Sequence, residues 1–90
     1  VFVKDGCAAC GQLVQRLQSS GAEFDLYMVG SRQDDARIRD WAKRAQIDPA
    51  RVRAGSITLN HDGGRWLSLG LPGDLPAAVR EVNGQWQRQP

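Results

Sequence analysis

The cysteines at positions 7 and 10 constrain this chain more than any other feature, because they stand between an apolar run and a helical pattern. Residues 1–4, which begin Val-Phe-Val, predict a short strand buried on both faces, and Asp5-Gly6 has the composition of a turn. From Cys10 onward, apolar residues recur at the i, i+3, i+4 and i+7 positions of one helix face. A Cys-x-x-Cys motif between a strand and a helix is typical of a redox-active cysteine pair.

The two cysteines have different expected roles. Cys7 precedes the predicted helix, where unpaired N–H groups and a partial positive charge favour a thiolate, so we expect it to be the attacking sulfur. Cys10 lies on the apolar helix face, which suits a resolving thiol. Ala8-Ala9 offers no cation, hydroxyl or imidazole, and Asp5 opposes a thiolate. We therefore expect Cys7 to be only moderately acidic.

Two other interpretations of the pair remain open. The first is an inert disulfide or thiol pair at the helix start, although closing so short a loop adds little stability. The second is a metal site. Zinc needs four ligands, whereas the sequence offers one Cys-x-x-Cys motif and a single histidine. No metal site within one chain is expected, and no cofactor is implied.

The first half of the chain alternates strand and helix patterns. A Ser-Ser-Gly stop at 19–21 ends the first helix, and residues 24–29 read as a second strand, parallel to the first. A second helix, capped by Ser31 or Asp34, carries an apolar face made of Ile38, Trp41, Ala42 and Ala45. The charged residues between them are expected to face water. Asp48-Pro49 predicts the start of a further short helix.

The second half changes to short strands with turn signals. Residues 56–60 and 65–69 predict a hairpin about His-Asp-Gly-Gly, and residues 77–82 and 85–89 predict a second hairpin about Asn83-Gly84. The order βαβα followed by antiparallel hairpins predicts one α/β domain over residues 1–90.

Composition excludes some classes of function. The net charge of +2 is too small to indicate nucleic-acid binding, and no apolar stretch approaches the roughly 20 residues of a membrane-spanning helix. The chain begins at Val1, without methionine, on an expected core strand. We therefore expect a fragment of a longer precursor, whose signal peptide would not be visible here.

The order of elements resembles the thioredoxin fold. Leu75-Pro76, followed by Ala-Ala-Val and an Asn-Gly hairpin, is similar to the loop that carries a cis-proline in that fold. The resemblance implies that Pro76 is cis and that the backbone of Leu75 pairs with a bound client. The chain departs from the fold in Gly6 before the motif, in the extra hairpin at 56–69, and in ending without a final helix.

Longer stretches resemble the thioredoxin-like integrating conjugative element protein family. They are Asp-Ala-Arg-Ile-Arg-Asp-Trp-Ala at 35–42, Ile-Asp-Pro-Ala-Arg-Val-Arg at 47–53, Ile-Thr-Leu-Asn-His-Asp at 57–62 and Leu-Pro-Ala at 75–77. The resemblance implies a periplasmic protein whose partners are clients with thiols or disulfides and proteins of the conjugation apparatus. We expect a thiol–disulfide oxidoreductase or isomerase; a non-catalytic interaction module is the alternative.

The single histidine and the tryptophans are further candidates. His61, in the predicted hairpin turn, is either a proton acceptor for Cys10 or an exposed turn residue. Trp41 is expected in the core. Trp66 and Trp86 are expected on separate hairpin strands, and if both are exposed they mark a docking surface for a protein.

Overall fold

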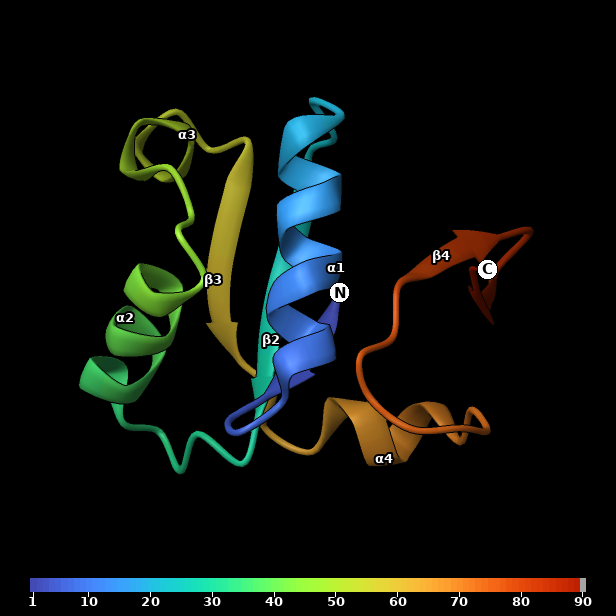
Figure 1. Cartoon of the computed structure of the whole chain (residues 1–90). Helices are drawn as coiled ribbons and strands as arrows, with labels where there is room; N and C mark the ends of the chain where they lie inside the picture. Colours follow the sequence, from blue (N-terminus) through green and yellow to red (C-terminus); the bar gives the residue numbers. More distant parts are fainter. Residues whose placement is uncertain (90) are drawn as a thin grey trace.

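The structure, a computed structural model that describes residues 1–89, is a mixed α/β domain, as the sequence predicts. Figure 1 shows α1 lying along the sheet, with α2 and α3 beside β3. The elements in chain order are β1 (Phe2–Lys4), α1 (Ala8–Ser19), β2 (Phe24–Val29), α2 (Asp35–Arg44), α3 (Pro49–Arg53), β3 (Ile57–His61), α4 (Arg65–Leu69), β4 (Val79–Val82) and β5 (Gln85–Arg88).

The main sheet has three parallel strands in the order β1-β2-β3. Val3 lies opposite Met28, which in turn lies opposite His61, so the register places these residues side by side at one end of the sheet. Parallel strands end at the same edge, and the carboxyl ends of all three strands therefore meet there. The turn that leads from β1 to the cysteine motif lies at this edge.

The core lies between this sheet and the helices α1 and α2. Alternate residues of β2, Leu26 and Met28, are buried, as the period-two pattern of a strand requires. They join a cluster completed by Val3, Cys10, Val14, Ile38, Trp41, Ile47 and Ile57. On the opposite face of the sheet, Phe2 stacks on Tyr27 with ring centroids 5.1 Å apart. The strand at residues 2–4 is therefore buried on both faces at Phe2 and Val3, whereas Lys4 is exposed.

The predicted N-terminal caps of the second and third helices are confirmed. Asp34 caps α2 by accepting a hydrogen bond from the Ala36 N–H at 3.0 Å. Asp48 caps α3 in the same way through Ala50, and Pro49 occupies the first helical position. Of the two predicted caps for α2, Asp34 takes the role, because the Ser31 hydroxyl contacts His61 instead.

The predicted hairpin at 56–69 is wrong. Its first strand joins the parallel sheet as β3, and its second is the helix α4. The Asp62 carboxylate accepts hydrogen bonds from the N–H groups of Gly64 and Trp66, which starts a helical turn. Trp66 then packs on Phe2, with ring centroids 5.3 Å apart. The hydrogen bonds of the Asp62 side chain and the aromatic contact thus override the Gly-Gly hairpin signal.

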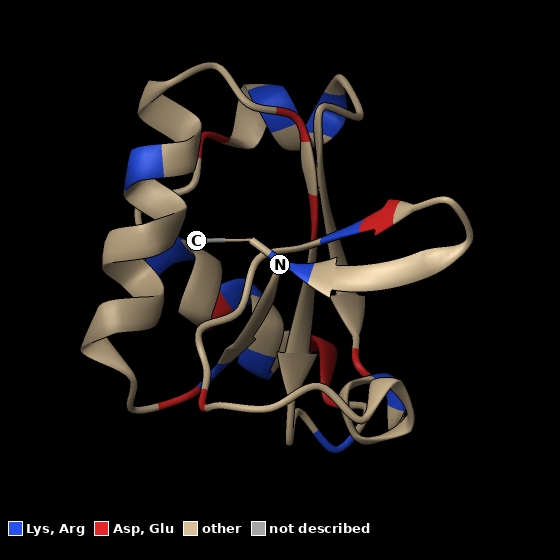
Figure 2. Cartoon of the chain, turned by 90° about the vertical axis from the view of Figure 1, so that its right-hand side faces the viewer, with Lys and Arg blue, Asp and Glu red and all other residues tan. Residues whose placement is uncertain are grey.

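The C-terminal hairpin is confirmed, with β4 and β5 antiparallel. Asn83 and Gly84 both have positive φ, at 52° and 80°, as a two-residue hairpin turn requires. An antiparallel backbone pair, Phe2 with Ala77, connects the segment before β4 to the sheet. Figure 2 shows the hairpin projecting to one side, with Lys and Arg scattered over this face rather than gathered in a patch.

Candidate functional site

The cysteine pair occupies the start of α1. Cys7 is the N-cap residue, and its Sγ accepts a hydrogen bond from the Cys10 N–H at 3.1 Å. The two sulfurs are joined in a disulfide, with the Cα atoms 5.3 Å apart. Cys10 is fully buried in the core, whereas Cys7 remains partly exposed. Of the two cysteines, Cys7 is thus the accessible one and Cys10 the enclosed one.

Local geometry explains this placement. Gly6 has a φ of 68°, which only glycine adopts readily, and it turns the chain from β1 into the motif. The Cys7 carbonyl and sulfur both accept from the Cys10 N–H, so the cap uses the cysteine side chain where Ser or Asp usually stands. After reduction, the N–H groups and the dipole of the helix start favour the thiolate of Cys7.

The loop at Leu75-Pro76 lies at the same end of β1. The peptide bond between these residues is cis, as the resemblance to the thioredoxin fold implies. Ala77 pairs antiparallel with Phe2, so the residues that precede it run beside β1 toward the motif. Cys7 and Leu75 both pack, partly buried, against the main core cluster. The structure therefore brings the predicted site residues to one end of the sheet.

Arg88 of β5 holds this loop, and sequence reasoning missed it. Its guanidinium donates to the carbonyl of Pro72 at 2.8 Å, to that of Asp74, and to that of Pro76 at 3.1 Å. It also lies over the Trp66 ring, 6.0 Å from the centroid. Twelve or more residues separate Arg88 from its carbonyl partners, so no local sequence signal could reveal the contact.

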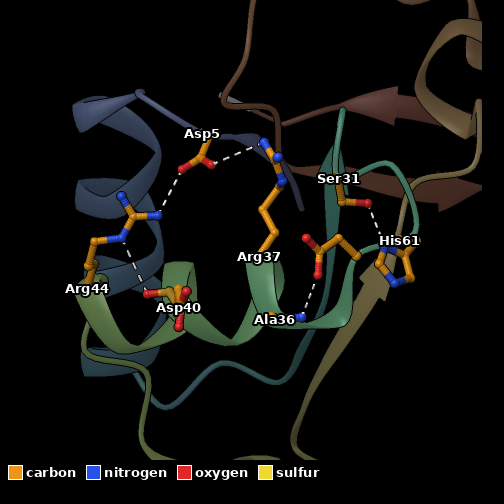
Figure 3. A network of polar contacts seen from close by, with 8 residues as sticks. Asp5, Ser31, Ala36, Arg37, Asp40, Arg44 and His61 are labelled. Carbon is orange, nitrogen blue, oxygen red and sulfur yellow. Dashed lines mark hydrogen bonds and ion pairs between the residues drawn. The ribbon is translucent and has the colours of Figure 1, made fainter.

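Two arginines of α2 pair with the acidic residue beside the motif. Arg44 Nη2 lies 2.9 Å from Asp5 Oδ1, and Arg37 Nη1 lies 3.9 Å from Asp5 Oδ2. Figure 3 shows Asp5 between the two guanidinium groups. Arg44 also lines, together with Ala8, a shallow groove of about 480 Å³ between α1 and α2. The sequence placed both arginines on a solvated helix face and did not predict these contacts.

His61 is neither an exposed turn residue nor a free base. It ends β3, and its side chain is only 19% exposed. Ser31 Oγ lies 2.5 Å from Nδ1, as Figure 3 shows, and Asp35 Oδ1 lies 2.7 Å from Nε2. Both ring nitrogens are therefore engaged. The hydrogen bond from His61, together with its charge, lowers the pKa of Asp35 below its usual value. His61 is thus a structural link between β2, α2 and β3, with no nitrogen left for Cys10.

The tryptophans do not form a shared surface. Trp41 is buried, as predicted, and Trp66 packs on Phe2. Trp86 is 44% exposed on the hairpin. Within residues 1–89, no group of three or more His, Cys, Asp or Glu side chains lies close enough to hold a metal ion.

Over the same described part of the chain, the helices are too short or too polar for any of them to cross a bilayer. Comparison of the chain with protein-family profiles, with curated protein sequences and with solved structures finds no significant match in any of the three.

Proposed function

We propose that this domain is a thioredoxin-like thiol–disulfide oxidoreductase or isomerase acting on envelope proteins of a conjugative transfer system. One observation carries the proposal: a partly exposed Cys7 at a helix start is bonded to a fully buried Cys10. An incoming thiolate can therefore reach only one of the two sulfurs. That asymmetry is what a two-step exchange through a mixed disulfide requires.

Oxidation of a client dithiol by the domain takes two steps. A client thiolate attacks Cys7 Sγ, the Cys7–Cys10 bond breaks, and Cys10 leaves as a thiolate that takes up a proton. A second client thiolate then attacks the client sulfur of the mixed disulfide and releases Cys7 as a thiolate. The client is oxidised to a disulfide and the domain is reduced to a dithiol. The reverse sequence reduces a client disulfide. In isomerisation, the Cys7 thiolate of the reduced domain attacks a client disulfide and releases one client thiolate. A different client thiolate then attacks the client sulfur of the mixed disulfide and releases Cys7, so that neither protein is oxidised overall.

The arrangement of strands supports the thioredoxin-like part of the proposal. β1, which leads into the motif, lies between parallel β2 and the antiparallel segment at Ala77. The loop with Leu75 and Pro76 therefore flanks the strand end from which Cys7 follows. The backbone of Leu75 is the proposed partner of a bound client strand. The periplasmic location and the conjugation partners rest on the sequence resemblance alone.

A non-catalytic interaction module is the second candidate function. Leu67 of α4 is 84% exposed, and Val82 and Trp86 of the hairpin are 36% and 44% exposed. Apolar side chains at these positions favour contact with another protein. This candidate predicts that partner binding persists when both cysteines are replaced.

The test is a thiol count across glutathione buffers, followed by alkylation and mass measurement, with turnover measured on a disulfide-linked fluorescent peptide. We expect the wild-type domain to exchange, Cys7→Ser to be inactive, and Cys10→Ser to accumulate a mixed disulfide with the peptide. Cys10→Ser and Cys7→Ser remove the same disulfide, so each is the matched control for the other. Slow alkylation of both sulfurs in the reduced domain, without turnover, would contradict the proposal.

A further inference from the structure

Asp5 stands two residues before Cys7, in the turn between β1 and α1, and both of its carboxylate oxygens face a guanidinium. Arg44 approaches one oxygen at 2.9 Å and Arg37 the other at 3.9 Å (Figure 3). The exposed fractions of the side chains are 39% for Asp5, 42% for Arg37 and 64% for Arg44, so the ion pairs lie at the surface, where water and salt screen them. Two positive charges from α2 thus surround one negative charge beside the motif.

An unpaired carboxylate at this position would disfavour a negative sulfur. Two charges about 8 Å apart in a water-like medium interact strongly enough to change the thiolate population about two- to threefold. The two arginines oppose this effect, because two positive charges on α2 accompany the one negative charge of Asp5. Ala8-Ala9 supplies no charge of its own, so the arginines of this cluster are a source of the positive charge that the motif lacks.

The elements next to the motif carry other charged residues besides this cluster. Arg44 and Ala8 line the same groove, which places this guanidinium beside the start of α1. The His61 and Asp35 side chains form a hydrogen bond with each other. The charged residues of β1, the turn after it, α1, α2 and the loop at 71–76 are Lys4, Asp5, Arg16, Asp35, Arg37, Arg39, Asp40, Lys43, Arg44 and Asp74.

We propose that Arg37 and Arg44, acting through Asp5, set the acidity of Cys7 and thereby the reactivity of the motif. The inference rests on the proposed thiol chemistry and adds the residues that regulate it. The arginines are positioning residues, since they contact Asp5 and not the reacting sulfurs. The same ion pairs join the turn before Cys7 to α2. They therefore affect both the local charge and the position of this turn.

The test measures the pH dependence of Cys7 alkylation by iodoacetamide in the reduced domain, with the modified sulfur identified by mass. We expect Arg44→Gln to raise the pKa of Cys7 and to lower its thiolate fraction near neutral pH about two- to threefold, and Arg37→Gln/Arg44→Gln to lower it further. Lys43→Gln is the matched control. It removes the same charge from the next residue of α2, and Lys43 forms no ion pair among residues 1–89.

Asp5→Asn should act in the opposite direction and lower the pKa of Cys7, and 1 M salt should shrink all these shifts. Thermal unfolding of each variant separates an electrostatic effect from a loss of fold. The proposal is overturned if the double arginine variant leaves the alkylation profile in place, or moves it no more than Lys43→Gln does. Alkylation needs no client, so a shifted pKa without turnover would contradict the proposed function and leave this inference standing.

Discussion

At the scale of single residues, Gly73 and Arg88 show how the loop before β4 is held. The Arg88 guanidinium donates to three carbonyls of this loop and leaves no room beside residue 73. A Cβ at position 73 would lie 2.7 Å from Arg88 Nη1, and the φ of Gly73 is 92°. The backbone conformation therefore favours glycine there, and a Cβ would also push the end of the Arg88 side chain away from its carbonyl partners.

We predict that Gly73→Ala destabilises the domain by about 1–2 kcal/mol, because alanine must adopt an unfavourable φ and displace Arg88. Gly11→Ala is the matched control. Gly11 lies inside α1, and a Cβ there meets no atom within 4 Å, so the substitution should stabilise the domain by about 0.5–1 kcal/mol. Urea unfolding measures both. Equal effects of the same sign would show that Arg88 does not confine this loop.

At the scale of elements, the start of α2 is joined to β3 by a titratable contact. Asp35 accepts from His61 at 2.7 Å, and this lowers the pKa of Asp35. The unfolded chain therefore binds a proton to this carboxylate at a higher pH than the folded domain does. By linkage, the contribution of Asp35 to stability is fully present above its unfolded pKa of about 4, and it is lost as the pH falls through the folded value.

We predict that Asp35→Asn lowers the thermal stability at pH 6 and flattens its dependence on pH below about pH 5. Wild-type and variant melting temperatures should converge in acid, because the carboxylate is then neutral in both states of the wild type. Asp34→Asn is the control, since asparagine preserves the helix cap and the neighbouring residue keeps the contact with His61. A constant difference between wild type and Asp35→Asn from pH 3 to pH 6 would contradict this account.

The elements that the sequence predicted well are those fixed by neighbours in the chain. The strand at 24–29, the caps Asp34 and Asp48, and the Asn83-Gly84 turn all depend on residues within a few positions of one another. The placement of Cys7 and Cys10 is local in the same sense. α4 was missed because its start depends on the Asp62 side chain and on a distant aromatic contact with Phe2.

The same distinction explains what was missed at the candidate site. Arg44 reaches Asp5 across 39 positions, and Arg88 reaches Pro72 across 16. A sequence pattern can place an arginine on the solvent face of a helix or on a strand. It cannot show which distant carboxylate or carbonyl the guanidinium will meet, because that depends on how the elements pack.

At the scale of the whole molecule, the domain has a well-packed part and a hairpin that makes few contacts with it. β2 lies between β1 and β3, and its inward residues Leu26 and Met28 are buried. β4 and β5 pair with each other, and nearly all of their residues are exposed. A two-stranded hairpin is marginally stable by itself, so its order depends on the Ala77 pair and on Arg88.

We predict that backbone amides of β4 and β5 exchange with deuterium at least tenfold faster than those of β2, by local opening that leaves the sheet intact. The hairpin follows the loop of Leu75 and Pro76, so its opening should also release that loop through Arg88. Arg88→Lys should therefore speed exchange in the hairpin and in residues 71–78 while leaving β2 unchanged, because a lysine ammonium cannot present a planar fork to three carbonyls.

Arg80→Lys, on an exposed position of β4, is the matched control and should leave both regions unchanged. Equal protection of β2 and the hairpin in the wild type would mean that the two parts open together, and the proposed client loop would then be as rigid as the sheet.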